Sequence, residues 1–156
     1  MARKPTQSRR RIVNKKARHN YHILLRVEAG IVLTGSEVKS LREGRAQITE
    51  AFVRINGYEA TLYGCQIDRY PPATDRNHNP QRKRRLLLHR REIRKLALQI
   101  APTGVTLIPL SLYFNDRGIA KVELGVATGK KAHDKREDLR KRDHQREMAR
   151  AMSRRR

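Results

Sequence analysis

The chain has 156 residues, with 37 Lys and Arg against 15 Asp and Glu, and its formal charge is +22. Such a balance is typical of proteins that bind the phosphates of nucleic acids. No apolar run is long enough to span a bilayer or to act as a signal peptide, and the single cysteine excludes an internal disulfide. We therefore expect a one-domain cytoplasmic protein with no membrane association.

Residues 1–18 form a basic arm with eight Lys and Arg and no acid. Apolar residues concentrate after this arm, between about Tyr21 and Ala127. The composition predicts three parts, which are the arm at 1–18, a folded body at 19–128 and a basic tail at 129–156.

The body is rich in predicted strands. Residues 21–27 and 30–33 read as two strands or one strand bent near Gly30. The dipeptide Asn56-Gly57 predicts a hairpin between strands at 52–55 and 59–67, because it suits the positive φ angles of a tight turn. Residues 105–114 and 119–127 predict another hairpin, in which Pro109 requires an edge or a bulge.

Two helices are predicted between these strands. Residues 34–44 begin with the capping-box spacing Thr34-x-x-Glu37 and end at Gly44, while residues 89–100 place apolar side chains on one face. About six strands with two or three helices indicate a mainly β protein. We predict an antiparallel β-barrel like the oligonucleotide-binding fold, followed by the basic tail.

A basic band lies beside an apolar run in the second half of the body. Arg82-Lys-Arg-Arg85 precedes Leu86-Leu-Leu88, and four more bases follow in the predicted helix. We expect the leucines to lie mainly in the core, with one of the three at the surface beside the bases. Aromatic residues are scarce, which favours recognition of a folded RNA by shape and phosphate contacts over stacking on single strands.

Catalytic and metal-binding patterns are missing from the sequence. The six histidines show no metal-ligand spacing, and Cys65 reads as an ordinary strand residue. We therefore predict that the protein is not an enzyme and needs neither a metal nor a cofactor.

The tail from Gly129 onward carries twelve Lys and Arg against five Asp and Glu and has almost nothing to bury. We expect it to be disordered in the free protein and to become ordered against a polyanion. Leu139, Met148 and Met152 form only a thin apolar stripe, so a helix there needs support from its surroundings.

Six motifs together resemble the SsrA-binding protein family, also called small protein B. They run in order from about Ile12 to Met152 and are Asn14-Lys-Lys-Ala-Arg-His19, Glu28-Ala-Gly-Ile-Val-Leu-Thr-Gly35, Glu37-Val-Lys-Ser-Leu-Arg42, Arg85-Leu-Leu-Leu88, Pro109-Leu-Ser-Leu-Tyr113 and Gly129-Lys-Lys-Ala-His-Asp-Lys-Arg136. The resemblance implies an adaptor that binds the tRNA-like domain of transfer-messenger RNA. In trans-translation, this adaptor brings the RNA to stalled ribosomes.

The resemblance also implies two sets of contact residues. The set for the tRNA-like domain, to which we add the basic band, is Asn14, Lys15, Lys16, Arg18, His19, Glu28, Lys83, Arg84, Arg85 and Leu87. The set for the decoding centre and the empty message channel of the small ribosomal subunit is Gly129, Lys130, Lys131, His133, Asp134, Lys135 and Arg136. The implied partners are transfer-messenger RNA, the ribosome with its small-subunit RNA and, through the charged RNA, elongation factor Tu. The family implies a monomer with a tail that is helical on the ribosome.

Two alternatives stay open at the level of sequence. One is a ribosomal or other structural RNA-binding protein, and the other is an RNA-processing enzyme. The first would associate mainly with ribosomal RNA, and the second would show RNA cleavage or modification with multiple turnovers.

Overall fold

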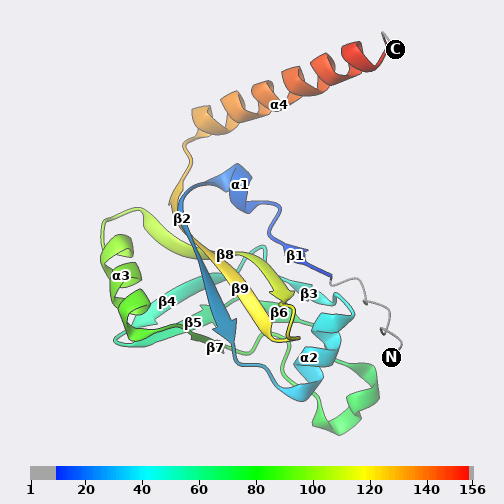
Figure 1. Cartoon of the computed structure of the whole chain (residues 1–156), viewed down its shortest axis with the longest axis vertical. Coiled ribbons are helices and arrows are strands. Elements are labelled where there is room, and N and C mark those ends of the chain that lie inside the picture. The colour runs from blue at the N-terminus through cyan, green and yellow to red at the C-terminus, as the bar shows by residue number, and fades with distance from the viewer. Residues whose placement is uncertain (1–9, 155–156) are drawn as a thin grey trace.

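A closed ring of six antiparallel strands forms the body of the protein, which a computed structural model describes over residues 10–154 (Figure 1). The ring runs β8, β4, β5, β7, β2, β9 and closes where β9 pairs with β8. Its strands are β2 (Tyr21–Ile31), β4 (Phe52–Asn56), β5 (Glu59–Tyr63), β7 (Arg84–Leu87), β8 (Val105–Phe114) and β9 (Ala120–Gly129). The predicted barrel of about six strands is confirmed.

Three short strands lie outside this ring. The strand β1 (Ile12–Val13) adds to β8, and β3 (Ala46–Gln47) pairs with β6 (Gln66–Ile67). Part of the predicted basic arm, with Arg3, Lys4 and Arg9, lies outside the described residues, as do Arg155 and Arg156 of the tail.

The hairpin β4–β5 forms where Asn56-Gly57 predicted it, and Gly57 has a φ of 58°. The second strand ends at Tyr63 rather than Ile67, because Gly64 adopts a φ of 69° and turns the chain out of the ring. Cys65 therefore lies in a buried connection to β6 and not within one long strand, which corrects our prediction.

The strand β2 is continuous through Gly30, and its irregular register lies between Ile23 and Leu25. Of the two predicted forms, a single strand is therefore the one that the structure has. Glycine serves instead for close approach, since a Cβ added at Gly30 would lie 3.1 Å from the Cβ of Leu87 on β7. The predicted bulge at Pro109 is confirmed by a register shift between Pro109 and Ser111.

Both predicted helices are present, as α2 (Gly35–Arg42) and α3 (Arg90–Ile100). The Thr34 amide donates to Glu37 Oε2 at 2.8 Å, and Gly44 beyond the helix end has a φ of 77°. Three further helices are α1 (Ala17–Asn20), the 3-10 helix η1 (Pro71–Arg76) and α4 (Ala132–Ser153). Of these three helices, our sequence analysis predicts only α4, as a helix that forms on the ribosome.

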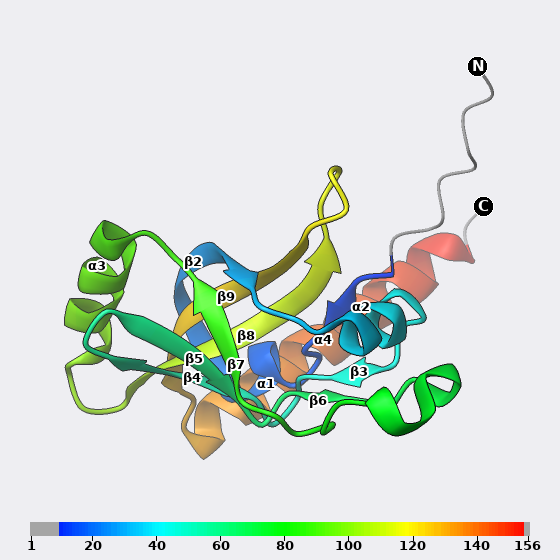
Figure 2. The same cartoon turned by 90° about the horizontal axis from the view of Figure 1, so that it is seen from below.

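The core lies inside the barrel, where eighteen buried residues from all six ring strands, from α2 and α3, and from β6 and the loops near it form one cluster. Leu41 of α2 and Leu96 of α3 each expose 1 % of their surface. Figure 2 shows these two helices at opposite ends of the barrel. Outside the barrel, Ala17 of α1 forms a second buried cluster with Ile108 and Leu110 of β8 and Ala127 of β9. The outward faces of β4, β5 and β7 stay accessible.

Candidate nucleic-acid interface

A shallow hollow of about 420 Å³ opens on the outside of the barrel, where β2, β7 and β9 meet the start of α3. Leu87 lies in it with 54 % of its surface exposed. The other lining residues are Glu28, Gly30, Tyr58, Arg85, Leu86, Leu88, His89, Glu92, Ile93 and Lys121. The hollow thus joins an apolar surface to charged groups of both signs.

Strand alternation decides which residues of β7 face this hollow. Side chains along a strand point to opposite faces in turn, so Arg84 and Leu86 are buried while Arg85 and Leu87 are exposed. Leu88 is partly buried. The expectation that one of the three leucines lies at the surface is confirmed, and the exposed residue is Leu87.

Glu28 is exposed at the hollow and is held by two partners. The Tyr113 hydroxyl donates a hydrogen bond to Glu28 Oε2, and Lys121 Nζ lies 3.9 Å from Oε1. Burial together with the bond to Glu28 and its negative charge raises the pKa of Tyr113 to about 12. The tyrosine therefore stays a donor at neutral pH, and it orients a carboxylate whose side chain is still 52 % exposed. Such a carboxylate can accept hydrogen bonds from base or sugar donors.

A second carboxylate stands directly opposite, because Glu28 and Glu123 are paired in register on β2 and β9. Two like charges in that position repel each other. Glu123 is compensated by Arg11 at 2.6 Å and Arg26 at 3.4 Å. These ion pairs leave the carboxylate of Glu28 as the one that faces the hollow.

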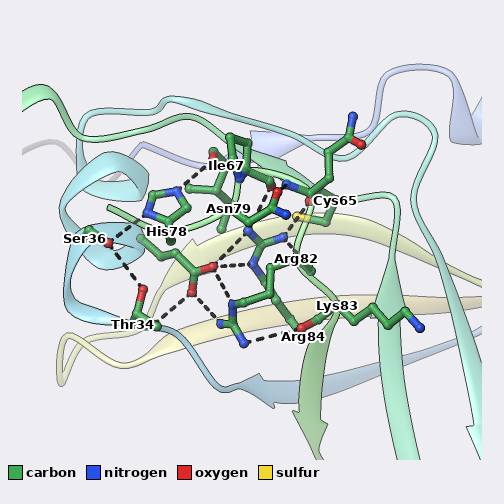
Figure 3. Close-up of polar contacts among 12 residues, drawn as sticks. Thr34, Ser36, Cys65, Ile67, His78, Asn79, Arg82, Lys83 and Arg84 are labelled. Carbon is green, nitrogen blue, oxygen red and sulfur yellow. Dashed lines mark hydrogen bonds and ion pairs between the residues drawn. The ribbon is translucent and has the colours of Figure 1, made fainter. Parts of the chain in front are cut away.

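Arg84 is not a surface residue, which corrects its place among the predicted RNA contacts. Its side chain is fully buried, and its Nε donates to Glu37 Oε1 at 3.0 Å. The other two guanidinium nitrogens of Arg84, Nη1 and Nη2, donate to the carbonyl oxygens of Cys65, Arg82 and Pro80 at 2.6 to 3.0 Å (Figure 3). Arg84 thus has no donor left for a phosphate and instead connects β7 to the loops around β6.

The partner of this arginine, Glu37, is likewise fully buried, and it also accepts from Arg82 Nη2 at 2.7 Å (Figure 3). Burial alone would raise the pKa of Glu37. The hydrogen bonds from Arg82 and the Thr34 amide, together with the charges of Arg84 and Arg82, outweigh burial and lower the pKa. The sequence indicated only the capping role of Glu37, because the cap is local while both arginines lie at least 45 positions away.

Asn14 is also an interior residue rather than an open RNA contact. It exposes 5 % of its surface, and its amide donates to the carbonyls of Ile48 and Pro109 at 3.3 and 3.1 Å. Its Oδ1 accepts from the Ala17 amide at 3.1 Å, which starts α1. Asn14 therefore supports the segment that carries its basic neighbours.

These neighbours are accessible. Lys15, Lys16 and Arg18 are exposed, and His19 is partly buried. They lie at the start of β2, whereas Glu28 lies seven residues further along, roughly 23 Å at the usual rise of a strand. The structure therefore does not bring the predicted contacts into one cluster, because they occupy two areas at opposite ends of β2.

The base of the tail is attached to the first of these areas. Lys130 Nζ donates to the Arg18 carbonyl at 2.7 Å and pairs with Asp138, so that only 8 % of the Lys130 side chain is exposed. The hydrogen bond from Lys130 lowers the pKa of Asp138. In this structure the Lys130 ammonium group thus connects α4 to the body, and its contact with ribosomal RNA stays a prediction.

The other predicted tail contacts differ in exposure. Gly129 ends β9 opposite Tyr21, and Asp134 lies 3.6 Å from His22 and 3.0 Å from His133. The exposed members of the set are Gly129, Lys131, His133 and Arg136, while Asp134 and Lys135 are partly exposed. None of the 22 residues of α4 is buried, and Figure 1 shows the helix extending away from the barrel. That the tail is disordered when free stays a prediction.

Residues 10–154 show neither a metal-binding cluster nor a membrane-spanning helix. Over residues 10–154, no three His, Cys, Asp or Glu side chains gather where they could hold a metal ion. No helix in that range is long and apolar enough to cross a membrane.

The family model described as SmpB protein matches residues 11–154 of the chain. The chain belongs to the SmpB family. An SsrA-binding protein of this family from Salinispora arenicola is 54 % identical over 153 residues, which cover 97 % of this chain and 96 % of the relative. The SsrA-binding protein of Methylobacterium nodulans is also 54 % identical, with 97 % and 98 % covered.

A solved SmpB structure shares the fold. It comes from "tmRNA-SmpB: a journey to the center of the bacterial ribosome", is 48 % identical and has a TM-score of 0.68. The match covers 78 % of this chain and 85 % of the solved one. The predicted membership of the family is therefore confirmed along nearly the whole chain.

Proposed function

We propose that the protein is an RNA-binding adaptor that binds the tRNA-like domain of transfer-messenger RNA and delivers it to stalled ribosomes for trans-translation. One observation carries the proposal. In an SmpB-family chain, the hollow exposes Leu87 beside the oriented carboxylate of Glu28, with Lys121 and Arg85 at its edge. An apolar contact beside hydrogen-bond acceptors and cations suits an unstacked base and the phosphates around it.

The two contact areas at opposite ends of β2 suit a folded RNA better than a flexible strand. The hollow lies near the end of β2, and the exposed cations Lys15, Lys16 and Arg18 lie before its start. Both areas can be occupied together only by an RNA whose own shape spans the distance between them. Recognition then depends on shape and phosphate contacts in addition to Leu87 and Glu28.

The tail acts on the ribosome in this proposal. The exposed side chains of Lys131, His133 and Arg136 follow the point at which Lys130 anchors α4 to the body. They would meet ribosomal RNA phosphates and bases in the empty message channel near the decoding centre, where α4 gains the surroundings that it lacks in isolation.

Further parts of the proposal concern how the protein works in the cell. It acts as a cytoplasmic monomer and contributes no chemistry of its own. Elongation factor Tu meets it indirectly, through the charged RNA. A preparation free of nucleases should therefore produce no cleavage or modification of RNA with multiple turnovers.

The test compares two exposed leucines. Leu87→Glu places a negative charge in the hollow, whereas Leu98→Glu places it on α3 at a residue that is 76 % exposed. We expect Leu87→Glu to weaken binding of the isolated tRNA-like domain at least tenfold and Leu98→Glu to leave it within about twofold, because only the first charge meets RNA. If both substitutions weakened RNA binding equally, the hollow would not be part of the RNA interface.

Cellular RNA captured by the protein separates the adaptor from a structural RNA-binding protein. The adaptor should enrich an RNA with a tRNA-like domain. Recovery of mainly ribosomal RNA from cells without stalled ribosomes would favour the alternative.

A further inference from the structure

The outward face of the hairpin β4–β5 carries aromatic rings and cations in ordered rows. Phe52 and Tyr63 are cross-strand partners, and their rings stack with centroids 5.4 Å apart and planes 7° apart. The Arg54 guanidinium lies 5.2 Å from the Phe52 ring and 5.7 Å from the Tyr63 ring. Lys83, which precedes β7, lies 5.3 Å from the Tyr63 ring. We name these four residues the aromatic platform.

The register of the neighbouring strands extends this platform by a second row. Arg54 pairs with Thr61, and Thr61 pairs with Arg85. Arg54, Lys83 and Arg85 are all exposed. The acid on this face is Glu59, which lies 3.5 Å from Arg85. The face therefore combines a strong positive charge with π surfaces.

At the tip of the same hairpin, Tyr58 is 51 % exposed and lies beneath two arginines of α3. Arg90 and Arg94 lie 5.1 and 5.4 Å from its ring centre, and Arg94 Nη2 is 3.2 Å from its hydroxyl. At the other end, Phe52 lines a small polar pocket of about 140 Å³ together with Lys16, which pairs with Glu50 at 3.7 Å. Cations thus accompany the aromatic residues along the whole hairpin.

We propose that the aromatic platform is a second RNA-binding face, which takes an unpaired RNA strand by base stacking. Bases stack on aromatic side chains and on guanidinium planes, so Arg54 can lie between the Phe52–Tyr63 pair and a base. The positive charges of Arg54, Lys83 and Arg85 can pair with the phosphates on either side of the stacked base. Barrels of the oligonucleotide-binding type bind strands on the corresponding outer surface, which agrees with this position.

The proposal goes beyond binding of the tRNA-like domain. The hollow presents the exposed Leu87 beside the oriented carboxylate of Glu28 and suits a folded RNA, whereas the aromatic platform suits bases that have no partner strand. Our sequence prediction disfavoured stacking on single strands because aromatic residues are scarce. The structure shows that Phe52 and Tyr63 lie in strands, on the outward face, where neither ring is buried.

The experiment measures binding of a fluorescein-labelled ten-nucleotide oligouridylate to the full chain, at enough salt to suppress contacts made by phosphates alone. We expect Phe52→Leu with Tyr63→Leu to weaken binding about tenfold, the effect of losing one stacked base. Arg54→Gln, which keeps both rings, should weaken it several-fold. Tyr70→Leu is the matched control, because Tyr70 also lies under a lysine, Lys39 at 5.4 Å, but away from this hairpin. The control should bind like the wild type.

Two further measurements separate stacking from folding and from the hollow. A duplex RNA of ten base pairs should bind all four proteins alike, since paired bases cannot stack on the platform. Leu87→Ala should leave oligouridylate binding unchanged even where it weakens the tRNA-like domain. Photo-crosslinks from 4-thiouridine should map to peptides containing Phe52 or Tyr63. Equal loss of duplex binding, or crosslinks confined to the basic arm and the tail, would overturn the proposal.

Discussion

The barrel and the helix α4 differ in how much of their structure comes from burial. The barrel encloses eighteen buried residues in one cluster, and even its buried ion pair is satisfied on every side. The 22 residues of α4 contribute no buried side chain. Tertiary packing supplies most of the stability of helices in proteins, so the barrel has one shape in any surroundings while α4 depends on what it meets. The difference separates a rigid recognition body from a responsive tail.

The strongest test of this comparison removes residues 132–156. We expect peptide tagging on stalled ribosomes to be abolished, because the exposed bases of α4 are lost. Binding of the tRNA-like domain should stay within about threefold and the unfolding midpoint in urea should stay unchanged, since none of the 22 residues of α4 is buried. Loss of RNA binding would show that the tail belongs to the recognition body.

Two neighbouring arginines on β7 test the rigid side of the comparison. Arg84→Ala removes the one fully buried cation that pairs with the buried carboxylate of Glu37, and we expect about 3 to 5 kcal/mol of lost unfolding free energy. Arg85→Ala should change stability by less than about 0.5 kcal/mol, because that side chain is exposed, but it should weaken RNA binding. Urea denaturation and RNA titration on both variants give the contrast. Similar stabilities would mean that the buried network does not hold the barrel.

Salt dependence tests which part of the protein meets the tRNA-like domain. Replacing Lys83, Arg85 and Arg90 by Gln should reduce the slope of log affinity against log salt by roughly two to three units, as each of three lost phosphate contacts contributes about 0.7 to 0.9. The matched change of Arg140, Lys141 and Arg142 in α4 should leave the slope unaltered. If only the α4 variant changed the salt dependence, α4 rather than the barrel would contact the tRNA-like domain.

Acid unfolding offers a smaller test of the buried network. Because the folded pKa of Glu37 lies below its ordinary value, its ionised form stabilises the fold above the unfolded pKa, and this contribution is lost as pH falls through the folded value. Glu37→Gln should therefore differ most from the wild type at neutral pH, and the difference should shrink with acidification. Unfolding free energies measured by urea between neutral and acidic pH provide the check. If the difference in unfolding free energy between Glu37→Gln and the wild type did not change with pH, the charge of Glu37 would not stabilise the fold.

The smallest expected effect lies within α4. Ala149→Gly should reduce the helicity of the tail, since glycine costs about 1 kcal/mol in a helix interior, while the urea midpoint of the barrel stays unchanged. Far-ultraviolet circular dichroism of the full and truncated chains gives the tail signal by difference. A shift in the barrel midpoint would show coupling between the regions, through the contact of Lys130 with the Arg18 carbonyl.

Several features of the fold could be predicted because their causes are local. Asn56-Gly57 marks a turn, Thr34-x-x-Glu37 caps a helix and Pro109 disrupts a ladder, and each feature acts within a few residues. Gly30 was misread because its reason is a close approach to Leu87, a contact between residues 57 positions apart.

The candidate site shows the same limit. Its motifs named Glu28 and Leu87, and both are exposed at one hollow. The motifs also named Asn14, and the basic band added Arg84, but the structure buries both residues. Neither signal indicated the outward stacking of Phe52 on Tyr63. A strand pattern shows that neighbouring side chains alternate, but it does not show which face meets the core when the whole segment is basic or apolar.

The sequence by itself determined the charge, the strand-rich body, the local turns and caps, and membership of a family of RNA-binding adaptors. The tertiary structure alone decided that Arg84 pairs with Glu37 in the interior while Arg85 faces solvent, and that Lys130 joins the tail to α1. The physical reason is desolvation. A buried charge is stable only beside distant partners that satisfy it, and closure of the barrel is what brings those partners together.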